Sequence, residues 1–386
     1  MVKLGFKGLV AVCFLSCACF AGCSDKAPDA AANPQAGQSS SEQTAPIWLE
    51  VKYDDVRLRE SAGMKGAVLG TLKTGDQVKD LGEWSKDLET VVLRDQRIKA
   101  PWGKVELKDG KQGWIFLGAL GPVIDPSIAE FKKELDKLDK TDCKSIAAAV
   151  DQFKIAMQGK PKFVADQAVP LLSEVVDAVI DKVNNELFTR SDLATFETMY
   201  DEEAIRKAPP KVRDEINAWK ACKLHLEFPE GMCVVLADPG IFDDEVGPFV
   251  SEPMQKFLAQ RKKELGEGYA NDGGLVVAIQ DLADRAVFWD NFLVEYPTFV
   301  NVPFIRSLAR NYAVDIVLGL DNTPSLGYEE DGALEKEFKD AYDWVLKEHP
   351  NTETAVLVQE WCDLLKQTGW KRSPKTDAYA TKLVGL

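Results

Sequence analysis

Histidine is nearly absent from this chain, and its scarcity limits the chemistry that the chain can perform. Only 2 of the 386 residues are histidine, His225 and His349, and they share no metal-ligand spacing. The cysteines lack the paired spacing of a zinc site, and no glycine-rich phosphate loop or Gly-x-Ser-x-Gly elbow occurs. The acidic runs at 243–245 and 329–332 lack the alternating ligands of a calcium loop. We therefore expect no metal, no cofactor and no enzyme built on these motifs.

Positive charge is also in short supply. The chain has 47 Lys and Arg against 62 Asp and Glu, which gives a formal net charge of −15. The excess lies in residues 122–386, where 31 basic and 47 acidic residues give −16, while residues 47–121 are close to neutral. A surface of this sign repels phosphate backbones and anionic headgroups. The composition therefore argues against nucleic acid as a partner.

The apolar run at residues 9–21 is too short to span a bilayer as a stable helix. Two lysines precede it, and it ends in Phe20-Ala21-Gly22-Cys23. This ending resembles a bacterial lipobox, with Phe at a position that is usually Leu. The resemblance implies a signal peptide over residues 1–22 and a palmitate-bearing lipid anchor on Cys23. An ordinary secretory signal is the alternative. By resemblance to Gram-negative sorting, Ser24 favours the outer membrane, facing the periplasm.

Residues 23–46 have the composition of a flexible linker. They are rich in Ala, Pro, Gln, Gly and Ser and contain almost no large apolar side chains. Such a stretch cannot bury enough surface to offset the entropy lost on ordering. We expect it to tether the folded part of an anchored, non-spanning protein to its membrane.

Four cysteines remain beyond Cys23, and an exported protein would hold them in an oxidising compartment. An even number predicts up to two disulfides with three possible connectivities. We favour Cys222–Cys233 together with Cys143–Cys362. Buried free thiols are the alternative.

Residues 47–121 alternate apolar and polar side chains between closely spaced Gly and Asp turns, which predicts a small β-barrel. Four blocks stand out: Val-Arg-Leu-Arg at 56–59, Leu-Gly-Thr-Leu-Lys-Thr-Gly-Asp at 69–76, Trp-Gly-Lys-Val at 102–105 and Asp-Gly-Lys-Gln-Gly-Trp-Ile at 109–115. With these blocks the segment resembles the bacterial SH3-like (SH3b-type) domain. It departs from shorter members over residues 85–100, whose apolar run suggests an extra strand.

The resemblance implies that the barrel binds cell-wall peptide or a protein partner in an aromatic-lined groove. Trp84, Trp102 and Trp114 are the candidate ligand-binding residues. Trp84 is the best placed, because it follows a strand and precedes a polar stretch. The alternative for Trp102 and Trp114 is a place in the small core. Glu83 and Asp109 would either accept hydrogen bonds from the ligand or serve in turns.

Residues 122–386 repeat apolar positions at three and four, which predicts an acidic α-helical domain. The expected helices lie near 126–139, 144–158, 161–188, 209–221, 248–265, 274–296, 302–319, 332–349 and 352–368. Residues 224–236 read as a β-hairpin. The segments 290–297 and 342–350 are similar helix ends that stop at a proline, so they resemble the helical hairpins of tetratricopeptide-like proteins.

The sequence thus predicts an α+β multidomain lipoprotein in which an SH3-like barrel precedes a helical domain. The expected function is non-catalytic: the barrel binds peptidoglycan or an envelope protein, and the helices serve as an interaction scaffold. One alternative is a cell-wall cysteine endopeptidase, because Cys143 in Asp-Cys-Lys-Ser at a helix start resembles the nucleophile of such enzymes. His225 or His349 would then be the base. A second alternative is a purely structural or assembly lipoprotein.

Overall fold

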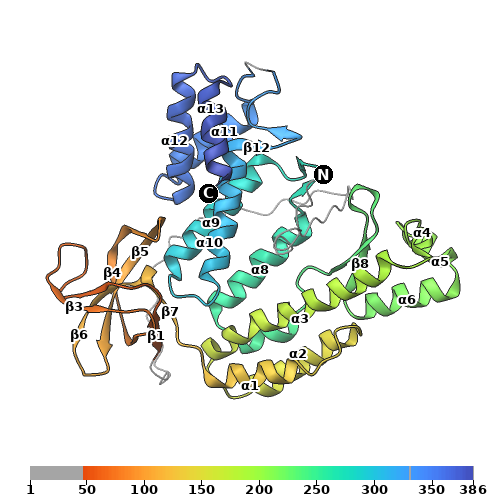
Figure 1. The fold of residues 1–386 in the computed structure, drawn as a ribbon, viewed down its shortest axis with the longest axis horizontal. Helices are drawn as coiled ribbons and strands as arrows, with labels where there is room; N and C mark the ends of the chain where they lie inside the picture. Colours follow the sequence, from red (N-terminus) through yellow and green to blue (C-terminus); the bar gives the residue numbers. More distant parts are fainter. Residues whose placement is uncertain (1–46, 330–331, 386) are drawn as a thin grey trace, which may run out of the picture.

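The computed structural model describes residues 47–329 and 332–385, and its α+β architecture agrees with the sequence prediction. The strands of the first part form one sheet, and helices form almost all of the rest (Figure 1). The signal peptide 1–22, the linker 23–46 and Cys23 lie outside the described residues. In the described part of the chain, no helix is both long and apolar enough to cross a membrane.

The first part is an antiparallel sheet that curls around a small apolar core. Its strands are β1 (Trp48–Val51), β2 (Val56–Arg59), β3 (Val68–Leu72), β4 (Gln77–Leu93), β5 (Gln96–Leu107), β6 (Gln112–Phe116) and β7 (Leu120–Pro122). Their order in the sheet is β3-β2-β6-β5-β4-β1-β7. A Cβ atom at Gly113 would lie 2.7 Å from the carbonyl oxygen of Arg59, so this approach of β2 and β6 requires glycine.

Residues 85–100 do not add the extra strand that the sequence suggested. They lengthen β4 and β5 into a hairpin, here called the arm, which pairs from Leu88↔Pro101 to Leu93↔Gln96. Arg94 and Asp95 form its turn with positive φ values of 46° and 66°. Two consecutive positive φ values are the geometry of a tight two-residue hairpin. The β-branched run therefore finds its partner within its own hairpin.

The second part contains all of the helices that the apolar spacing predicts, with ends shifted by a few residues. The helices are α1 (Pro126–Leu135), α2 (Lys144–Met157), α3 (Lys162–Phe188), α4 (Leu193–Phe196), α5 (Glu202–Lys207), α6 (Pro210–Ala221), α7 (Asp243–Val246), α8 (Glu252–Glu267), α9 (Ile279–Glu295), α10 (Val302–Leu318), α11 (Lys336–Glu348), α12 (Glu353–Gln367) and α13 (Pro374–Val384). The apolar spacing did not predict α4, α5 and α7, which are too short to show a period, or the terminal α13.

Short strands and 3-10 turns connect these helices. The predicted hairpin is present as β8 (Leu224–Glu227) and β9 (Val234–Ala237). Two smaller hairpins follow α8 and α10: β10 (Ala270–Asn271) with β11 (Gly274–Leu275), and β12 (Gly319–Leu320) with β13 (Thr323–Pro324). The 3-10 turns are η1 (Leu117–Ala119), η2 (Pro229–Gly231) and η3 (Gly247–Phe249).

Two helical hairpins, α9–α10 and α11–α12, stack on one another through α9 with α11 and α10 with α12 (Figure 1). This is the arrangement that the two similar helix ends indicate. Two hairpins are fewer than the three or so that a stable helical array needs. Neighbouring helices supply further core: Phe257 of α8 packs against Trp289 with ring centres 5.6 Å apart, and Leu383 of α13 is buried.

The sheet is attached to the helices at two places. At the arm, Lys99 Nζ donates to the carbonyl oxygen of Asn351 at 2.5 Å, and Arg97 Nε lies 3.4 Å from a carboxylate oxygen of Glu353. At the connection after β7, the buried Gln167 of α3 accepts from the Asp125 backbone N–H and donates to the Val123 carbonyl (2.8 and 3.0 Å). These contacts fix the orientation of the sheet.

The disulfide in the structure differs from both pairs that we favoured. Cys143, just before α2, is bonded to Cys222, just after α6. The expected pairs Cys222–Cys233 and Cys143–Cys362 are therefore wrong. Cys233 and Cys362 are buried free thiols, and burial raises their pKa values to about 12 and about 11. The packing of α6 brings its end to the start of α2, while the other two thiols face the apolar core.

Removing this disulfide should destabilise the helical part. It joins residues that are 79 positions apart, so its loss restores chain entropy worth about 4 kcal/mol to the unfolded state. We expect Cys143→Ser with Cys222→Ser to lower the free energy of unfolding by roughly that amount in urea titrations, with Cys362→Ala as the control that keeps the bond. Non-reducing peptide mapping should link the Cys143 and Cys222 peptides. A link between Cys222 and Cys233 would contradict the structure.

Candidate binding cleft between the sheet and the helices

A cleft of about 1700 Å³ opens where the sheet meets the helices. Its walls are contributed by the tip of the arm, α3, the hairpin β8–β9 and the loop that follows it, α8, α10 and the start of α12. Pockets for small molecules commonly measure 300–1,000 Å³. A cleft of this size suits an extended chain better than a compact cofactor.

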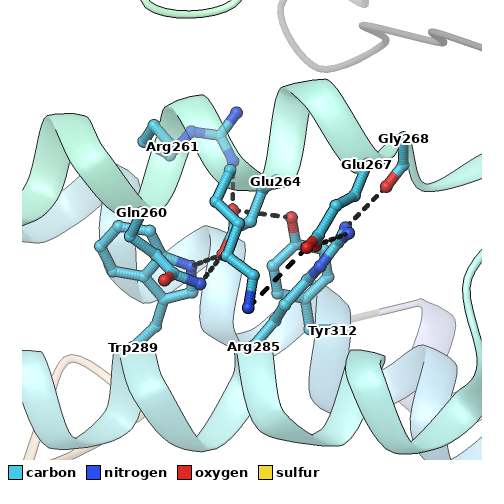
Figure 2. A network of polar contacts seen from close by, with 9 residues as sticks. Gln260, Arg261, Glu264, Glu267, Gly268, Arg285, Trp289 and Tyr312 are labelled. Atoms are coloured by element: carbon cyan, nitrogen blue, oxygen red, sulfur yellow. Dashed lines mark hydrogen bonds and ion pairs between the residues drawn. The ribbon is translucent and has the colours of Figure 1, made fainter. Parts of the chain in front are cut away.

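Glu264 of α8 anchors one wall of the cleft, although only 3% of its surface is exposed. Its Oε1 accepts from Trp289 Nε1 at 2.7 Å and from Gln260 Nε2 at 2.9 Å. Its Oε2 accepts from Arg261 at 2.6 Å and from the Tyr312 hydroxyl at 3.1 Å. Figure 2 shows these four donors converging on the carboxylate. A buried charge needs such partners, and this one holds Arg261 and Tyr312 in position on the wall.

Arg285 of α9 fixes the end of α8 next to this network. One of its terminal nitrogens donates to the Gly268 carbonyl at 2.8 Å, and the other lies 3.0 Å from Glu267 (Figure 2). Gly268 ends the helix with a φ of +76°, which favours glycine. The chain can therefore turn there and place Tyr269 in the cleft.

Tyr269 and Asp315 form a second polar pair on the cleft wall. The Tyr269 hydroxyl donates to the Asp315 carboxylate, and the Tyr269 ring lies 5.5 Å from that of Tyr312. Burial raises the pKa of Asp315 to about 6. The contact between the two rings places the Tyr269–Asp315 pair next to the Glu264 network.

None of the three predicted tryptophans lines the cleft. Trp102 is core, with 3% of its surface exposed, and its Nε1 donates to Glu89 of the arm at 2.9 Å. Trp114 is half-buried against the same core, whereas Trp84 is 39% exposed on β4. The sheet instead contributes Tyr53 to the cleft. Tyr53 lies between β1 and β2, and the alternating pattern of residues 47–121 does not distinguish it as a cleft residue.

The turn of the arm places a cation beside that aromatic side chain. The Arg94 guanidinium lies 5.2 Å from the centre of the Tyr53 ring, and both residues line the cleft. Asp109 lies in a turn, where it accepts from the Lys111 N–H at 3.0 Å. Glu83 lies within β4 and pairs with Lys104 at 2.9 Å.

The structure does not assemble a nucleophile–base pair around Cys143. Its sulfur is in the disulfide, so no thiolate is available while that bond is intact. His225 lines the cleft with Nε2 3.2 Å from Glu227 and Nδ1 2.7 Å from Asp238. The hydrogen bond to Glu227 and the contact with Asp238 raise the pKa of His225 above its ordinary value. His349 packs on Trp344.

Two carboxylates of the acidic run at 243–245 are paired with lysines. Asp243 pairs with Lys262 at 3.5 Å, and Glu245 pairs with Lys154 at 2.6 Å. The run at 329–332 includes two residues outside the description. Among the described residues, no group of three or more His, Cys, Asp or Glu side chains could hold a metal ion.

Comparison with known proteins identifies the sheet. Residues 54–120 match the family described as the bacterial SH3 domain. This match confirms the SH3-type domain that the sequence motifs indicate, and it points to cell-wall material or protein as the general kind of partner. No curated protein and no solved structure gives a significant match to the chain.

The Tyr269–Asp315 pair should make stability depend on pH. Burial raises the Asp315 pKa from 3.8 to about 6, so the folded state binds this proton more tightly than the unfolded state. The resulting stabilisation is complete below about pH 4 and is lost as the pH rises through 6. Between pH 4 and 7, the unfolding free energy of Asp315→Asn should therefore rise relative to wild type, by on the order of 2 kcal/mol. Exposed Asp281→Asn is the control, and an equal difference at both pH values would contradict the assignment.

Proposed function

We propose that this protein is a non-catalytic, lipid-anchored binding protein of the bacterial cell envelope, and that its ligand occupies the central cleft. The cleft itself carries the proposal: it is wide, and the SH3-type domain and the helices wall it jointly. The general kind of partner of bacterial SH3 domains makes peptidoglycan the first ligand to test.

The anchor rests on the Phe-Ala-Gly-Cys ending of the signal at Cys23. A diacylated terminus followed by the linker 23–46 would hold the cleft away from the outer membrane, within the periplasm. The Cys143–Cys222 disulfide supports an oxidising compartment. We expect labelled palmitate to enter the wild-type chain and not Cys23→Ser, which should leave the membrane fraction. Unchanged labelling and fractionation would remove the anchor from the proposal.

The proposal that the protein is non-catalytic is supported by the bonds that its potentially reactive side chains already make. Cys143 is bonded, and His225 lies between two carboxylates. Glu264 already accepts four hydrogen bonds. These groups are arranged to hold a surface in place. We expect no muropeptides to be released when the protein is incubated with peptidoglycan.

Sedimentation with purified peptidoglycan tests the binding function with the full-length protein. Phe304 lines the cleft with 41% of its surface exposed, so Phe304→Ala removes an aromatic contact there without opening the core. Trp84 is equally exposed and lies outside the cleft, so Trp84→Ala is its matched control. We expect Phe304→Ala to reduce the retained fraction about tenfold and Trp84→Ala to leave it unchanged.

Two results would contradict this account. Loss of retention with Trp84→Ala alone would move the ligand to the exposed face of β4. No retention of the wild-type protein would remove peptidoglycan as the ligand. The second result would favour the structural or assembly lipoprotein, which the docking of the arm on α12 also supports.

A further inference from the structure

The rim of the cleft next to the arm carries three arginines that come from both parts of the protein. Arg94 lies at the turn of the arm, and Arg306 and Arg310 lie one turn apart on the same face of α10. Arg306 reaches the arm, with its guanidinium 3.5 Å from the Gln96 side-chain oxygen. All three line the cleft. Within the described ranges 47–329 and 332–385, none of the three forms an ion pair, whereas Arg97 beside them is paired with Glu353.

The positive charge of this rim contrasts with the net negative charge of the chain. Residues 122–386 carry a net charge of −16, yet the turn of α10 that faces the cleft carries Arg306 and Arg310 and no carboxylate. Asp95 of the arm and Glu353 and Glu360 of α12 also line the cleft, but none of them forms an ion pair with the three arginines in the described part of the chain. Guanidinium groups bind carboxylates through paired, charge-assisted hydrogen bonds. Unpaired guanidinium groups from two domains on one rim therefore point to an anionic group on the ligand.

The part of the cleft lining formed by α3 and the loop after β9 is negatively charged. The α3 helix contributes Glu174 and Asp177, and the loop contributes Asp238. Glu174 is paired with Lys132 at 3.3 Å, and Asp238 contacts His225, but Asp177 forms no ion pair within the described part of the chain. A ligand carrying several negative charges and no positive one would be repelled here. A ligand with both signs would match both regions.

Resting on the proposed function, we propose that the cleft binds an amphoteric peptide, such as the peptide portion of peptidoglycan, with a carboxylate at the rim formed by Arg94, Arg306 and Arg310. An ammonium group of the same peptide lies toward the acidic lining of α3. The Tyr53 ring beneath Arg94 offers an apolar face to the peptide backbone between the two ends. The arginines discriminate between ligands, and the Glu264 network keeps the wall rigid.

Isothermal titration of the full-length protein with soluble peptides released from purified peptidoglycan tests this inference. The peptides are used untreated, amidated at their carboxyl groups, or acetylated at their amines. We expect amidation to weaken binding about tenfold or more, because charge-assisted bonds to the arginines are lost. Acetylation should also weaken binding, through the acidic lining.

Two arginine substitutions locate the effect. Arg306→Gln with Arg310→Gln should weaken binding of the untreated peptides about tenfold and leave binding of the amidated peptides unchanged. The matched control is Arg206→Gln, an exposed arginine of α5 outside the cleft. Near-wild-type circular dichroism would show that each variant is folded.

The outcomes separate this inference from the proposed function. Retention on whole peptidoglycan with equal affinity for untreated and amidated peptides, or with no peptide binding, would overturn the inference and keep the function. Charge-dependent peptide binding without retention on whole peptidoglycan would support the inference and remove the intact cell wall as ligand. If the protein is not retained on whole peptidoglycan and does not bind the peptides, both the proposed function and this inference are wrong.

Discussion

The docking of the arm on the start of α12 is the contact on which the cleft depends. Lys99 and Arg97 bond to Asn351 and Glu353, and this contact places the turn of the arm opposite α10. Without it, the SH3-type domain would be held to the helices mainly by the Gln167 connection. One wall of the cleft would then have no fixed position. The inserted residues of β4 and β5 therefore serve the assembly of the whole molecule, beyond the sheet that contains them.

The opposite walls of the cleft are held by buried polar groups that have hydrogen-bond partners. Glu264 joins α8 to α9 through Trp289 and to α10 through Tyr312. A half-satisfied network of this kind would be worse for stability than an apolar contact, whereas a complete one specifies a single arrangement. The helices around the cleft are thus held in register by directional bonds as well as by apolar packing.

Much of the fold was readable from the sequence, because local patterns encode it. The period of two across Leu49 and Val51, and the period of three and four along α3, each report one buried face. The SH3 motifs are also local, and the family match confirms them. The lining of the candidate cleft could not be predicted in the same way. Tyr53, Arg94 and Arg306 are far apart in the chain and meet only because the arm reaches α10.

The disulfide and the tryptophans show the same limit. Cys143 and Cys222 pair because the fold brings the end of α6 next to the start of α2, and no spacing in the sequence records that. Trp102 resembled a groove residue, but it packs in the core of the sheet, and the inserted arm supplies the acceptor, Glu89, for its N–H. Residue type identified candidates, while long-range packing decided which of them reach the cleft.

Hydrogen exchange of the full-length protein, with and without peptides released from peptidoglycan, tests the central claim most directly. Backbone amides in the arm and in α10 belong to different domains, and both line the cleft. If the ligand lies between them, both segments should gain protection together, while β3 and α6 stay unchanged. Protection confined to the outer face of the sheet, or none in α10, would contradict a binding site shared by the two domains.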